Sequence, residues 1–131
     1  MKSGRTFPSS LTKTVGPIQA IDLALYAAAS GDHNPLHLDE LVAKEVGFEK
    51  PVVHGMLSMA YLGRLLTDEF GVRALAHLHT RFMGIAMRGQ TLQFVATLNQ
   101  VIDGTAHYQL TVLNDTGAIV VEGLTHINQS S

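Results

Sequence analysis

Residues 55–70 are the segment that most constrains how this chain can fold. Apolar residues cover most of the circumference of the helix predicted here, and only a narrow stripe is polar, made by Ser58, Tyr61, Arg64 and Asp68. A helix that is apolar nearly all round is a buried helix. A chain of 131 residues is one domain with a modest core, so residues 1–131 must include other elements that wrap this helix.

Later segments are predicted to form the strands that cover this helix, because apolar and polar residues alternate in them with a period of two. They lie at 74–83, 92–99, 105–112 and 119–127. Such alternation indicates strands with one covered face and one wetter face. Asp103-Gly104 and residues 114–117 have the composition of hairpin turns. The expected fold class is therefore α+β, an antiparallel sheet in meander order that curls around one long helix.

The first part of the chain predicts shorter elements. They are a strand at 9–15 and helices at 18–29 and 39–46. Between the two helices, residues 32–38 form a turn-rich segment, because Pro35 pushes Asn34 out of the α region. This segment cannot continue either helix.

Composition and charge narrow the classes of function. The net charge is −2 and no basic run exists, so a nucleic-acid partner is not expected. Cysteine is absent, which excludes disulfides, thiolate nucleophiles and Cys-based zinc sites. No apolar run approaches the length of a membrane span, and the first residues lack a signal-peptide core. We therefore expect a cytoplasmic chain without a membrane partner.

Asp32 and His37 are the candidate acid and base. Adding water across an α,β-unsaturated thioester needs a base for the water proton and an acid for the α-carbon, and Asp and His often serve in such work. Because Pro35 interrupts any helix, the loop can curl and bring both side chains towards one point. The alternative is that Asp32 caps a turn and His37 is an ordinary loop residue.

Gly55 stands at the expected start of the central helix. N–H groups in a first helical turn have no intrahelical partner, and the helix dipole adds positive potential there. Such a donor would stabilise an enolate-like thioester oxygen. The alternative is that Gly55 only permits a sharp chain entry. Ser58, one turn later, either lines the same cavity or bonds a backbone carbonyl.

Histidine pairs elsewhere do not predict a metal site. His33 and His37 would need a helix to share a face, and Pro35 denies it. His77 and His79 share one face of a strand, but no third ligand is evident from the sequence. We expect neither a metal nor another cofactor.

Two motifs carry a family resemblance. Residues 26–37 read Tyr-Ala-Ala-Ala-Ser-Gly-Asp-His-Asn-Pro-Leu-His, and residues 52–56 read Val-Val-His-Gly-Met. In these motifs the chain resembles the MaoC-like dehydratases, also called (R)-specific enoyl-CoA hydratases, most strongly over residues 20–66. The resemblance implies a hot dog fold with the helix from Gly55 at its centre. It also implies a homodimer whose sheets join edge to edge, with higher assembly open.

The resemblance implies roles for single residues as well. Asp32 and His37 would activate a water, and the Gly55 N–H would bind the thioester oxygen. Asn34 resembles a residue that positions the loop. The predicted substrate-binding residues are Asn34, His54 and Ser58.

The activity implied is reversible hydration of trans-2-enoyl thioesters to (R)-3-hydroxyacyl thioesters. The acyl group would be carried on coenzyme A or acyl carrier protein, with no cofactor beyond that carrier. One alternative is a non-catalytic subunit that binds acyl thioesters or a partner. Another is a hot dog acyl-CoA thioesterase, but such enzymes commonly place a carboxylate on or near the central helix, and here none precedes Asp68.

The chain also departs from the family pattern in two places. Gly63 occupies a position where some relatives carry a serine. Met87-Arg88-Gly89-Gln90 stands where many relatives have a Pro-Gly-Asp-like turn. Both departures leave the shape of the pocket and the acyl length open.

Overall fold

The computed structural model describes residues 6–129. Within this range the elements are, in chain order, β1 (Ser10–Val15), α1 (Ala20–Ser30), the 3-10 turn η1 (Pro35–His37), α2 (Glu40–Val46), α3 (Gly55–Phe70), the 3-10 turn η2 (Val72–Ala74), β2 (Leu75–Phe82), β3 (Leu92–Ile102), β4 (Thr105–Leu113) and β5 (Ile119–Asn128). The helix predicted at 55–70 is confirmed, and each predicted strand is present.

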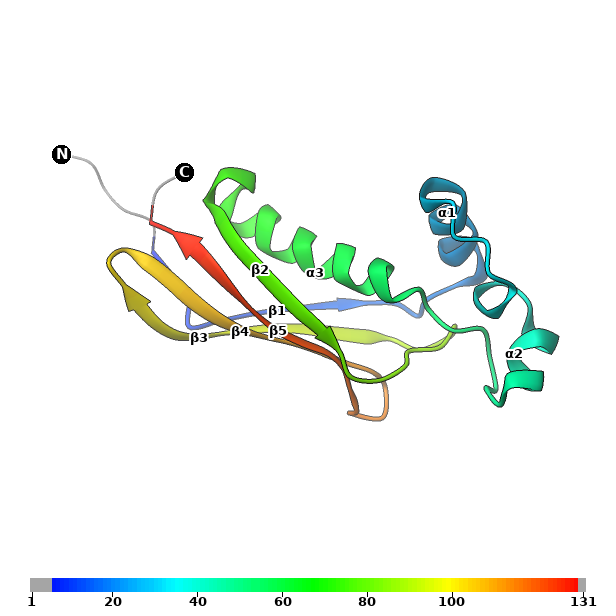
Figure 1. The fold of residues 1–131 in the computed structure, drawn as a ribbon. Coiled ribbons are helices and arrows are strands. Elements are labelled where there is room, and N and C mark those ends of the chain that lie inside the picture. Colours follow the sequence, from blue (N-terminus) through cyan, green and yellow to red (C-terminus); the bar gives the residue numbers. More distant parts are fainter. Residues whose placement is uncertain (1–5, 130–131) are drawn as a thin grey trace.

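The strands form one antiparallel sheet in the order β1-β3-β4-β5-β2 (Figure 1). The hairpin turn at Asp103-Gly104 is confirmed, since both residues have positive φ, 51° and 78°. The expected meander order holds for β3, β4 and β5 but is wrong for the outer strands, because β2 pairs with β5 and β1 with β3. The connection at residues 83–91 is too long to force β2 to pair with β3. Short turns fix only the pairing of β3 with β4 and of β4 with β5.

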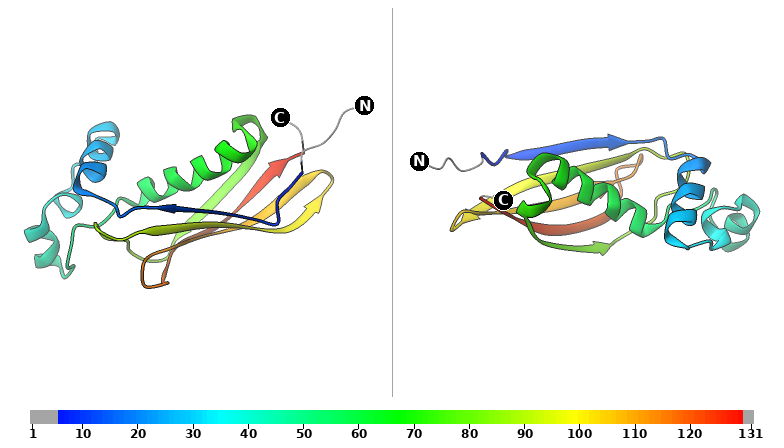
Figure 2. Two further views of the ribbon diagram at one scale, coloured as in Figure 1. Left: turned by 180° about the vertical axis from the view of Figure 1, so that it is seen from behind. Right: turned by 90° about the horizontal axis from the view of Figure 1, so that it is seen from above.

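Helix α3 lies along one face of this sheet, and the two together form a hot dog fold (Figure 2). Leu62 and Leu66 are fully buried in one apolar cluster with Phe94 and Tyr108 from the sheet. Burying a leucine of this kind contributes roughly 1.5–3 kcal/mol. The core therefore sits between α3 and the inner face of the sheet.

The side of α3 that faces away from the sheet is not buried, which corrects the expectation of a helix enclosed all round. Met56 is 55% exposed, and Ala60 and Arg64 are exposed too. One sheet of five strands covers only one side of the helix within a single chain. Ser58, expected in the polar stripe, is instead only 2% exposed because it lies on the covered side.

Helices α1 and α2 lie beyond one end of the sheet, close to where α3 begins (Figure 2). Helix α1 ends at Gly31, whose φ of 81° lies in the left-handed region that favours glycine. Asp39 caps α2 by accepting from Leu41 N–H, as the position of a helix N-cap requires. None of the helices in residues 6–129 is long and apolar enough to cross a bilayer.

Candidate active site

The loop between α1 and α2 brings Asp32 and His37 together. Asp32 Oδ2 lies 3.6 Å from His37 Nε2. Asp32 Oδ1 accepts the backbone N–H of Asn34 at 3.3 Å, and Asn34 Oδ1 accepts that of Leu36 at 3.0 Å. These short-range bonds hold the turn, and a positioning role for Asn34 stays a prediction. The contact between the two side chains agrees with the sequence, and their chemical roles stay a prediction.

A backbone carbonyl fixes the tautomer of His37. The Val52 oxygen lies 2.8 Å from His37 Nδ1. Because a carbonyl oxygen only accepts, Nδ1 carries the hydrogen, and the neutral ring presents the lone pair of Nε2 towards Asp32. Val52 is held in turn by its bridge to Met87. Sequence reasoning missed Val52 because the group that acts is a backbone atom without a side-chain signature.

His54 contacts both Asp32 and His37 from the buried side of the loop. Its ring stacks on His37 with centroids 3.8 Å apart, and Tyr26 contacts it edge-on at 4.8 Å. Its Nε2 donates to the backbone oxygen of Asp32 at 3.1 Å. Only 1% of His54 is exposed, and burial lowers the pKa of the ring. The side chain predicted to touch substrate thus lies beneath His37 rather than on an open surface.

Gly55 begins α3 directly after His54. No hydrogen bond of its N–H is found among residues 6–129, as expected for the first position of a helix. A methyl group at Gly55 would lie 3.1 Å from Phe82 Cε1. Ser58 Oγ makes no hydrogen bond within the same residues, so the alternative of a bond to a backbone carbonyl is not observed.

Three side chains of the site could together hold a small cation. The ligand atoms of Asp32, His37 and His54 lie within 4.8 Å of one another. The donor nitrogen of His54, however, already binds the Asp32 carbonyl. His33, the other histidine of the motif, is exposed and is not part of this group. The expectation that no metal is required stays a prediction.

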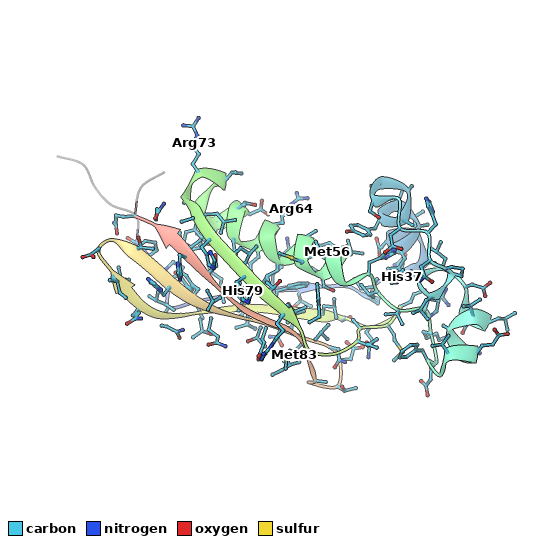
Figure 3. All side chains as sticks on the ribbon, viewed as in Figure 1. His37, Met56, Arg64, Arg73, His79 and Met83 are labelled. Atoms are coloured by element: carbon cyan, nitrogen blue, oxygen red, sulfur yellow. The ribbon has the colours of Figure 1, made fainter. Side chains whose placement is uncertain are left out.

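Exposed apolar side chains lie near the start of α3, where Gly55 is close to Phe82. In Figure 3, Met56 on α3 lies between His37 and Arg73, and Arg73 follows the far end of that helix. Phe82, Met83 and Ile85 follow at the end of β2 and are each 45–49% exposed. An acyl chain or a second protein surface would cover such a patch favourably.

The hot dog fold thus carries an Asp–His pair in the loop between α1 and α2, next to His54, the residue that precedes α3. Residues 4–118 match the family described as MaoC like domain, and the chain belongs to that family.

Individual relatives agree with this assignment. The chain is 33% identical over 96 residues to the (R)-specific enoyl-CoA hydratase of Aeromonas caviae, a match that covers 73% of this chain and 64% of that protein. It is 32% identical over 94 residues to the peroxisomal hydratase-dehydrogenase-epimerase of Neurospora crassa, covering 72% of this chain but only 10% of that protein. The unliganded R-hydratase PhaJ1 of Pseudomonas aeruginosa has a similar structure, with a TM-score of 0.83 and 26% identity over all of this chain and 83% of that one. The matches to the Aeromonas caviae and Neurospora crassa proteins thus span less than two thirds of the length of each of those two relatives.

Proposed function

We propose that this chain adds water reversibly to trans-2-enoyl thioesters and yields (R)-3-hydroxyacyl thioesters. The observation that carries the proposal is the separation of 3.6 Å between Asp32 Oδ2 and His37 Nε2, with His37 Nδ1 committed to Val52. A gap of this size is too long for a direct hydrogen bond but leaves both atoms able to contact one water. Family membership supports the same class of reaction.

The chemistry follows from the tautomer of His37. The water donates one hydrogen bond to Nε2 and the other to the Asp32 carboxylate. Nε2 takes the first proton while the water oxygen forms a bond to C3. The C2–C3 π pair becomes a C1–C2 double bond, and the C1–O π pair moves to the thioester oxygen, which gives an enolate whose C1–C2 pair accepts the next proton. The imidazolium then returns this proton to C2, so both fragments of one water are added and His37 is restored. Asp32 orients the water and stabilises the transient imidazolium.

Gly55 supplies the remaining element of this mechanism. Its N–H would bind the thioester oxygen as negative charge develops there, aided by the positive end of the α3 dipole. His54 precedes Gly55 and contacts both residues of the Asp–His pair, through its stack on His37 and its hydrogen bond to the Asp32 backbone oxygen. It would therefore hold the Gly55 N–H and the Asp–His pair in a fixed relative position. No cofactor is needed beyond the coenzyme A or acyl carrier protein that bears the acyl group.

We also propose that the working unit is a homodimer. β2 is an outer strand of the sheet, and its backbone groups on one side are free to pair with a second copy. The exposed Phe82, Met83 and Ile85 lie at the end of this strand. Pairing would cover an edge and an apolar patch next to Gly55 at the same time.

A panel of enoyl-CoA thioesters of graded length tests the function. We expect loss of the enoyl-thioester absorbance with at least one substrate, and no release of free thiol. Thiol release from saturated acyl-CoA would instead identify a thioesterase. Tight binding of enoyl-CoA without turnover would identify a non-catalytic subunit.

A further inference from the structure

Four of the seven histidines lie on the outer face of the sheet, away from α3. Three of them are direct neighbours across strands: His77 on β2 is opposite His126 on β5, and His126 is opposite His107 on β4. Residues directly opposite each other in a sheet share a face and have adjacent side chains. The sequence did not show that His77 has histidine neighbours on other strands. In the structure His126 lies beside it, and His107 lies on the other side of His126.

The ring of His126 lies close to each of the other two rings. The ring centroids of His77 and His126 are 5.1 Å apart, and those of His107 and His126 are 4.1 Å apart. No hydrogen bond or ion pair of these three rings is found with other residues in 6–129. Their nitrogen lone pairs are thus available to a ligand.

We propose that His77, His107 and His126 form a surface site for a divalent transition metal of the Zn²⁺ or Ni²⁺ type. Imidazole is a preferred ligand of these ions. With Zn–N bonds of about 2.0–2.1 Å, two imidazoles at a tetrahedral angle have ring centroids about 5 Å apart. The two pairs that involve His126, at 5.1 and 4.1 Å, lie near that value. His77 and His107 lie on the strands either side of β5 and have to turn towards His126, and a water completes the coordination.

Occupation of the site requires the rings to turn. Within the described residues, only Asp32, His37 and His54 already have their ligand atoms within 4.8 Å of one another. His77 is exposed and the other two are half-buried, so rotation about the side-chain bonds is fast and moves no backbone. Burial and the two neighbouring imidazoles lower the pKa of His126, which favours the neutral form that binds metals.

His79 provides the matched control. It lies on the same strand and face as His77, but the residue opposite it is Leu124 rather than a histidine. Figure 3 labels His79 on β2. A site built across the strands needs His126 and not His79, whereas a chelate along β2 would need His79 and not His126.

The test is a calorimetric titration of tag-free protein with ZnCl₂. All variants carry His37→Ala, which removes one of the three possible ligands Asp32, His37 and His54, so that this second group does not compete for Zn²⁺. In this background we expect one bound Zn²⁺ per chain, and Zn²⁺ should raise the melting temperature. Adding His126→Gln or His77→Gln should weaken binding at least about tenfold, since even a residue that only orients a metal ligand contributes 10–100-fold to affinity.

His79→Gln should leave the Zn²⁺ affinity unchanged. Circular dichroism checks the fold of each variant. If His126→Gln does not fold, His77→Gln on the exposed edge strand still tests whether the site contributes to Zn²⁺ affinity. Absence of Zn²⁺ binding in the His37→Ala background would overturn the proposal. Equal effects of His79→Gln and His77→Gln would overturn it as well, because they would indicate a chelate along β2.

Discussion

At the scale of single residues, two histidines of this site have opposite environments. His37 is half-buried and turns Nε2 towards Asp32, while His54 is fully enclosed between His37 and Tyr26. His54 Nδ1 is the one fully buried side-chain nitrogen or oxygen without a hydrogen-bond partner in residues 6–129. A charged imidazolium would be costly there, which favours the neutral form of His54 beneath His37, the residue that we propose as the base.

This burial predicts a dependence of stability on pH. Burial lowers the pKa of His54 in the folded state from its usual value of 6.5. Below pH 6.5 the unfolded chain binds a proton that the folded chain resists, so the free energy of unfolding falls as the pH drops through that window. His126 acts in the same direction, also through burial. Urea unfolding at several pH values between 7.5 and 5 measures the effect.

His54→Phe separates the contribution of His54. Phenylalanine keeps an aromatic ring between Tyr26 and His37 but cannot be protonated, so the loss of stability on acidification should become smaller. His33→Gln, at an exposed position of the same loop, should keep the wild-type slope. An unchanged slope in His54→Phe would show that His54 does not titrate as the structure implies.

At the scale of elements, the proposed function assigns the binding of a developing negative charge to the start of α3. Gly55→Pro removes the N–H but suits a first helical position, and the extended backbone of His54, with φ −56° and ψ 130°, is compatible with a following proline. Loss of one oxyanion donor costs about 10²–10³ in rate. We therefore expect the proline variant to fold and bind substrate but to have a kcat lower by roughly that factor.

Gly55→Ala is the control for this prediction. It keeps the N–H, and its methyl group only requires Phe82, which is 49% exposed, to move by a few tenths of an ångström. Its kcat should remain well above that of the proline variant. A folded Gly55→Pro with wild-type kcat would move the oxyanion site elsewhere.

Helices and strands could be predicted from the sequence, whereas strand pairing and contacts distant in sequence could not. The apolar run from Gly55 to Phe70 predicted α3 correctly, because a helix of this period has few alternatives. Alternation likewise identified the strands, but it does not specify partners, so the pairing of β2 with β5 was missed. The contact of Asp32 with His37 was predictable from the turn at Pro35, whereas the Val52 carbonyl and the burial of His54 were not, since both depend on contacts distant in sequence.

At the scale of the whole molecule, the free edge of β2 and the exposed face of α3 predict association. Sedimentation at low micromolar concentration should give a homodimer, because pairing along β2 satisfies backbone groups and covers Phe82 and Met83. Phe82→Lys together with Met83→Lys should shift the equilibrium towards monomer. An active wild-type monomer at that concentration would refute the dimer.

The whole site also predicts a stereochemical outcome. If Asp32 and His37 hold one water on one face of a flat enoyl group, the hydroxyl and the proton arrive from the same face, and addition is syn. The family relationship favours the (R)-3-hydroxyacyl product, and chiral chromatography of the hydrolysed product of crotonyl-CoA measures it. Efficient coupling to an (S)-specific 3-hydroxyacyl-CoA dehydrogenase would contradict this assignment.

Turnover of crotonyl-CoA, or of the best substrate in the panel, by wild type, Asp32→Asn and His37→Ala tests the central claim most directly. The pair should act on the water alone and not on the core, so both variants should melt near the wild-type temperature. Each should lower kcat by roughly 10²–10⁴, because the acid–base step needs both the proton transfer by His37 and the orientation of the water by Asp32. Near-wild-type turnover in both folded variants would show that the water is activated elsewhere.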